Sequence, residues 1–206
     1  MAFGAGVLIS AVAYELVLDA VDEGSPATLA LGIFAGAITF YVGDALLDKK
    51  GGDKRKSSAA KAAAGAGGLA IVLGTALDGV PESLVLGLDL LGGEEGSSFL
   101  IAVFLSNVPE AIAATTGLKA GGWATRRIFG VWGLVIAVSA LSTAIGYTAF
   151  DDASGETVAF VLAFAAGAIL TMLADTMMPE AFEHSGKAVG LLTTLGFATA
   201  FATQSL

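Results

Sequence analysis

The chain contains no cysteine and only one histidine, and charged residues make up only 14% of its 206 residues. Without cysteine it can form neither disulfides nor thiolate metal sites. The scarcity of charge, together with a mean hydropathy of +0.81, excludes an ordinary soluble domain. Hydrophobic residues are abundant instead, at 55%. This composition predicts an integral membrane protein, and nothing in it predicts a nucleic-acid partner.

Long apolar stretches follow one another along the chain. A membrane-spanning helix needs about 20 mostly apolar residues. Seven stretches approach this length, at residues 2–20, 27–47, 66–88, 98–118, 126–148, 157–180 and 188–205. Each is expected to be a helix, because lipid cannot satisfy free backbone groups. The sequence therefore predicts an all-α polytopic transmembrane helical bundle, with residues 1–206 forming a single transmembrane domain.

Basic residues are confined to alternate gaps between these stretches. All ten follow the second, fourth or sixth stretch, two of them at the first positions of the fifth, and the other gaps carry only acids. They are Lys49, Lys50, Lys54, Arg55, Lys56, Lys61, Lys119, Arg126, Arg127 and Lys187. Because lysine and arginine stay on the cytoplasmic side, the pattern predicts a multi-pass cell-membrane protein with a cytoplasmic N-terminus and an extracellular C-terminus. Residues 48–65 then form a basic cytoplasmic loop, as a topology signal or a contact for anionic lipid.

The first and sixth stretches resemble each other. AFGAGVLISAVAYELVLDA (2–20) aligns without gaps with AFAAGAILTMLADTMMPEA (163–181). The charge pattern orients these two stretches in opposite directions. An inverted repeat recurs in transporters and places the binding site between the two halves, although alanine and glycine also raise the rate of chance matches.

Acids interrupt the apolar stretches. Asp78 and Glu82 lie four residues apart, on one helix face. Together with Glu110 in the next stretch they would cost about 8–10 kcal/mol if ionised in lipid. No lysine or arginine lies centrally in any stretch to offset this cost. We therefore expect these acids to be protonated, to line water or to hold a cation. Asp44, close to a stretch end, is expected to reach the interface.

A proline accompanies each of the two central acidic motifs. Pro81 and Pro109 have no N–H, which leaves the carbonyls of the residues four positions earlier without a helical partner. Carbonyl oxygens beside these carboxylates and the Asn107 amide favour hard or borderline divalent cations, such as magnesium, calcium or manganese, with iron(II) or zinc as further candidates.

The stretch LDGVPESLVLG, followed by FLSNVPEAIA, resembles the paired fourth and fifth helices of the ZIP family of divalent-metal transporters. In that family a His-Asn-x-Pro-Glu-Gly motif faces a His-x-x-Pro-Glu motif at a mid-membrane transport site. The basic loop and MMPEAFE resemble the family's cytoplasmic loop and seventh helix, so that the likeness covers nearly the whole chain. It implies a transporter rather than an enzyme, which moves zinc, or a broader set such as iron, manganese and cadmium, inward as substrate and needs no organic cofactor.

The resemblance also implies the site. Glu82 and Glu110 match the motif glutamates, whereas Asp78 and Ser106 replace the motif histidines, which implies a variant without histidine in the transport site. Asn107 takes the position after Ser106. The expected metal-binding residues, including those of the outer and cytoplasmic paths, are Asp78, Glu82, Asn107, Glu110, Ser106, Asp175, Glu180 and Glu15.

The chain departs from the family in its number of helices. ZIP proteins usually have eight helices, and seven are predicted here, as though the family's first helix were missing or Met1 were an internal methionine. The family's inverted repeat would then leave two, two and three helices. A homodimer in the lipid bilayer is compatible with the resemblance. An intramembrane hydrolase that uses paired acids, and a membrane scaffold that does not transport, remain as alternatives.

Overall fold

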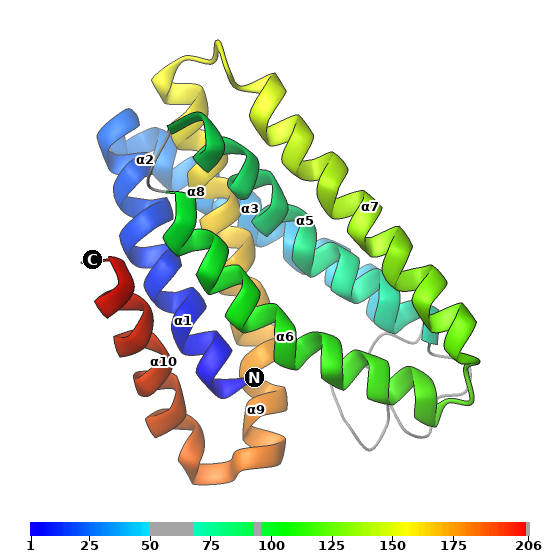
Figure 1. Cartoon of the computed structure of the whole chain (residues 1–206). Coiled ribbons are helices and arrows are strands. Elements are labelled where there is room, and N and C mark those ends of the chain that lie inside the picture. The colour runs from blue at the N-terminus through cyan, green and yellow to red at the C-terminus, as the bar shows by residue number, and fades with distance from the viewer. Residues whose placement is uncertain (50–67, 93–95, 205–206) are drawn as a thin grey trace.

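The computed structural model describes residues 1–49, 68–92 and 96–204, and the described residues form helices joined by short turns (Figure 1). The predicted all-α bundle and its seven helical segments are confirmed. Most of the predicted basic loop, residues 50–65, lies outside the described residues. In chain order the elements are α1 (Ala2–Ala11), η1 (Val12–Leu16), α2 (Val17–Glu23), α3 (Pro26–Asp48), α5 (Gly68–Gly92), α6 (Gly96–Ala120), α7 (Thr125–Ala149), α8 (Gly155–Met172), η3 (Leu173–Met177), α9 (Met178–Ser185), η4 (Gly186–Ala188) and α10 (Val189–Gln204).

Five of the described helical segments are long and apolar enough to cross a membrane. They are Ala2–Glu23, Pro26–Asp48, Ser98–Ala120, Thr125–Ala149 and Gly155–Glu183. The first and last of these are the interior helices, since 56% of each apolar window is buried, against 11% for α7. Large apolar side chains such as Leu31, Phe34 and Ile38 on α3 point outward, which suits contact with lipid.

Local sequence sets where the helices begin and end. The Ser25 Oγ accepts a hydrogen bond from the Thr28 N–H at 3.3 Å and caps α3, and Pro26 occupies its first turn. At the end of α6, Gly122 has a φ of +80°, a conformation that favours glycine and allows the chain to reverse into α7.

The two ends of the chain form an inverted pair of helix units. The helix from α1 to α2 and the helix from α8 to α9 run in opposite directions, because α2 lies beside α8 and α1 lies beside α9 (Figure 1). The helix that follows each unit packs against the other unit. α3, which follows α2, packs along α8, and α10, which follows α9, packs along α1. The similarity of residues 2–20 to 163–181 therefore has a structural counterpart.

Glycines allow α10 to approach α1, and α3 to approach α8, closely enough for backbone contact. A Cβ on Gly6 of α1 would collide with the carbonyl oxygen of Thr193 on α10, and one on Gly167 of α8 would collide with the carbonyl oxygen of Ile33 on α3. Gly6 and Gly167 are aligned residues of the repeat. The same kind of helix–helix interface thus occurs once in each half, in opposite orientations.

Both interior helices also contain a π-helical turn at the same aligned position. These turns are η1 and η3, which begin at Val12 and Leu173. A π turn is rare and often marks a functional region. Its repetition at matched positions shows that the two halves share local backbone geometry as well as packing.

The remaining helices place the central acids. α5 packs along α7, where a Cβ on Gly146 would meet the carbonyl oxygen of Leu84. α6 crosses α1, where a Cβ on Gly4 would lie 2.9 Å from the Cα of Ser106. Pro81 and Pro109 lie inside α5 and α6, and α6 bends part way along (Figure 1).

Candidate metal site

The central acids of the predicted metal site are carried by α5 and α6. Asp78 and Glu82 stand one turn apart on α5 and are only 3% and 2% exposed. Glu110 on α6 is half-buried, and Pro109 directly precedes it. Since α5 and α6 are neighbours, their two proline-containing segments face one another. The structure therefore brings the two motifs together.

The side chains of these motifs pair across the two helices. The Asn107 amide nitrogen donates a hydrogen bond to the Glu82 Oε2 at 2.8 Å. The carboxyl groups of Asp78 and Glu110 lie close enough to interact across the same two helices. The site is thus two cross-helix pairs, one of them a carboxylate with an amide and the other two carboxyl groups.

Glu180 brings a third helix to this group. It lies on α9, is 3% exposed and is close enough to Glu110 for the two charges to interact. The amino group of Met1 lies within electrostatic reach of both. Glu180 thus interacts with the central acids from a third helix.

Ser106 lies beside this group but faces another helix. It is 1% exposed, and its Oγ donates a hydrogen bond to the Val103 carbonyl oxygen at 2.9 Å. Its backbone packs against Gly4, with the methyl group of Met177 nearby. A histidine at this position would have to fit into the contact between α1 and α6.

Two predicted residues lie apart from the central group. No contact described for Asp175 joins it to the central acids, although it lies in η3, one turn before Glu180. Glu15, in η1, belongs to a different group, in which its charge and that of Asp19 act on Asp89 of α5.

Asp89 was not among the predicted site residues. It is half-buried and lies in the apolar segment LGLDLLG. Eleven residues separate it from Asp78, which is close to three full helical turns, so that both lie on the same face of α5. A search for acids at helical spacing over a longer window could have identified it.

Asp44 does not reach the membrane interface, contrary to the expectation from the sequence. It is only 3% exposed, because its position on α3 turns it inward.

The charge balance of the central group is the main electrostatic feature of the site. α5 contains no lysine or arginine, and in α6 only Lys119 is basic, about 13 Å along the helix from Glu110. Among the described residues, no three side chains drawn from histidine, cysteine, aspartate and glutamate converge in a way that could hold a metal ion. In this arrangement Glu82 pairs with the amide of Asn107, and Asp78 pairs with Glu110, across α5 and α6.

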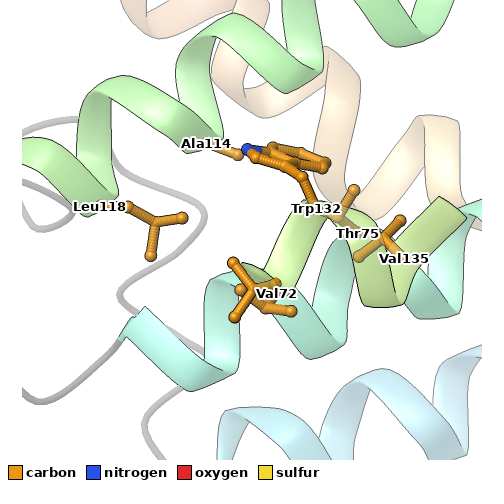
Figure 2. A pocket seen from close by; sticks show the side chains of 7 residues that line it. Val72, Thr75, Ala114, Leu118, Trp132 and Val135 are labelled. Carbon is orange, nitrogen blue, oxygen red and sulfur yellow. The ribbon is translucent and has the colours of Figure 1, made fainter. Parts of the chain in front are cut away.

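A small hollow elsewhere in the bundle is apolar, unlike the group of central acids. It lies between α5, α6 and α7 and is lined by apolar side chains, with Thr75 and the Trp132 ring at its edge (Figure 2). The Trp132 indole N–H donates to the Thr115 Oγ1 at 2.9 Å. The hollow leaves no room for a water molecule and none of the central acids lines it, so that it is a packing defect apart from the site.

Comparison with known proteins gives one informative likeness. No family model matches the chain, and no solved structure matches it. The chain is 25% identical over 211 residues to an Arabidopsis thaliana protein whose description is "putative zinc transporter". The alignment covers 98% of this chain and 33% of that protein. The chain is thus similar along nearly all its length to about a third of a protein described as a transporter.

Proposed function

We propose that this chain forms a membrane transporter for a divalent metal cation, with the ion bound between α5 and α6. The observation that carries the proposal is the burial of Asp78 and Glu82 beside Glu110, on helices without a nearby lysine or arginine. Burying several carboxylates is costly unless a cation compensates them. The likeness to the Arabidopsis thaliana protein supports the same conclusion.

The donor set determines which ions fit. The carboxylate oxygens of Asp78, Glu82 and Glu110 and the carbonyls freed by the two prolines are hard or borderline ligands. With no histidine or cysteine on α5 or α6, we propose zinc, or a broader set that includes iron(II), manganese and cadmium. The two cross-helix pairs would have to open toward one ion, which a cation could drive by attracting the carboxylates of Asp78, Glu82 and Glu110.

The path through the membrane follows from the order of the acids. Glu15, with Asp19 and Asp89, would collect the ion at one end, and Glu180 and Asp175 would receive it toward the other. With the cytoplasmic N-terminus predicted from the basic residues, this order gives inward transport across the cell membrane. The inverted halves support alternating access, in which α5 and α6 move relative to the other helices.

Uptake into proteoliposomes tests the proposal. The purified chain is reconstituted and offered a panel of zinc, manganese, iron(II) and cadmium. We expect uptake of at least one ion, and we expect Glu82→Ala and Glu110→Ala to abolish it while both variants still insert. Asp152→Asn, at an exposed turn, is the matched control and should transport normally.

The outcomes separate this proposal from its alternatives. Normal uptake by both glutamate variants would overturn the site. A chain that cleaves substrates without moving ions would indicate a hydrolase, and a chain that tolerates all replacements without uptake would indicate a scaffold.

A further inference from the structure

Asn107 has a polarity that matters for its role. Its side chain carries a hydrogen-bond donor, Nδ2, and an acceptor, Oδ1, on opposite sides of one planar amide. The donor is the end that meets Glu82, at 2.8 Å from Oε2. The amide N–H thus faces the carboxylate, which is the orientation that suits a carboxylate acceptor. The cation-binding end of Asn107 therefore points away from the carboxylate that it contacts.

The partner in this contact is the most buried carboxylate of the site. Glu82 is 2% exposed, so that water is poorly placed to orient its side chain. Its charged neighbours are Asp78, one turn earlier on the same helix, and Glu110 on α6, and the charges of both repel it. The hydrogen bond from Asn107 is thus the described contact that favours one position of the Glu82 carboxylate, and it leaves Oε1 outside that bond.

We propose that Asn107 is a positioning residue and not a ligand: through its amide N–H it holds Oε2 of Glu82, so that Oε1 is presented to the divalent cation. This inference rests on the proposed transport function and assigns a role within the same site. Groups that orient a ligand commonly change metal affinity by ten- to a hundredfold when they are removed. The role requires a donor at position 107, whereas a ligand would require an oxygen.

Exchange of Asn107 for aspartate separates these two roles, because it keeps the size and shape of the side chain and replaces the donor by an oxygen. If Asn107 positions Glu82, Asn107→Asp places two carboxylates in contact, moves Glu82 and raises the Kd for the ion about tenfold or more. If Asn107 were a ligand, the added carboxylate would bind the ion at least as tightly as the amide did. The two roles thus predict changes of opposite sign.

The measurement is binding of manganese(II) to the purified full chain, followed by electron paramagnetic resonance, which distinguishes free from bound ion. The wild type, Asn107→Asp, Glu82→Gln and the double variant are compared. A residue that acts through Glu82 loses its effect once Glu82 is altered, so that Asn107→Asp should add little to Glu82→Gln. Thermal unfolding without metal reports whether each variant is folded.

Each result decides between the roles. Tighter or unchanged manganese binding by a folded Asn107→Asp overturns the positioning role and leaves the proposed function standing. Additive losses in the double variant also overturn it. A wild type that binds none of zinc, manganese, iron(II) or cadmium overturns the proposed function, and the positioning role with it. Weaker binding by Asn107→Asp, without further loss in the double variant, supports the inference.

Discussion

Gly6 on α1 and Gly167 on α8 make the same contact in two inverted halves of the molecule. A Cβ on either would collide with a carbonyl oxygen of the helix packed against it, that of Thr193 or that of Ile33. Because the obstacle is backbone, it cannot move aside as a flexible side chain could. The close approach of α10 to α1 and of α3 to α8 therefore depends on a missing side chain at two matched positions.

Substitution of these glycines should destabilise the bundle. We expect Gly6→Ala and Gly167→Ala each to lower the free energy of unfolding by about 1–3 kcal/mol through overpacking. Gly133→Ala on α7 is the control, because no atom lies within 4 Å of its added Cβ, and it should be neutral or stabilising by up to about 1 kcal/mol. Thermal unfolding in detergent measures the three variants, and equal stability of all three would contradict the packing described.

The carboxylate of Glu156 joins the two halves at one end of the bundle. It accepts a hydrogen bond from the Ser25 N–H at 3.1 Å and another from the Thr28 hydroxyl, at the beginning of α3. A negative charge at a helix N-terminus is favourable. We expect Glu156→Ala to cost about 1 kcal/mol of stability, whereas Asp151→Ala, at the adjacent exposed turn, should cost less than half as much. Chemical denaturation of both variants tests this contact, and indistinguishable midpoints would exclude it.

Ser106 should tolerate a smaller side chain but not a larger one. Its buried position against Gly4 leaves little room, so that Ser106→His should lower stability by about 1–3 kcal/mol. Ser106→Ala loses only the hydrogen bond to the Val103 carbonyl oxygen and should cost about 1 kcal/mol or less. The two melting temperatures provide the test. A Ser106→His protein as stable as the wild type would show that the contact between α1 and α6 opens easily.

Binding of a cation should stabilise the folded chain. A ligand that binds only the folded state adds about 2.7 kcal/mol at a hundred times its Kd. We therefore expect the melting temperature to rise with added manganese or zinc, to return after chelation and to stay constant in Glu82→Ala. A rise in melting temperature that persists in Glu82→Ala would place the ion elsewhere.

Apolar length and charge placement were enough to predict the seven helices, because each reflects a requirement of the bilayer. The resemblance of the two proline motifs to a facing pair of helices implied that α5 and α6 would be neighbours, whereas the hydrogen bond between Asn107 and Glu82 was not predicted. By contrast, the π turns at Val12 and Leu173 have no local sequence signal, since a π turn depends on how neighbouring helices constrain the backbone. Asp44 was misjudged for a related reason: distance from a helix end does not say which way a side chain points.

The unequal burial of the helices has a consequence for how the chain adapts to its surroundings. α3 and α7 present side chains such as Phe34 and Leu134 outward, whereas more than half of the apolar window in each repeat helix is shielded. The outer helices therefore have to match the thickness of a particular membrane. Transfer to a thicker bilayer would call for changes on α3 and α7, and the oxygen-bearing side chains of the interior could stay as they are.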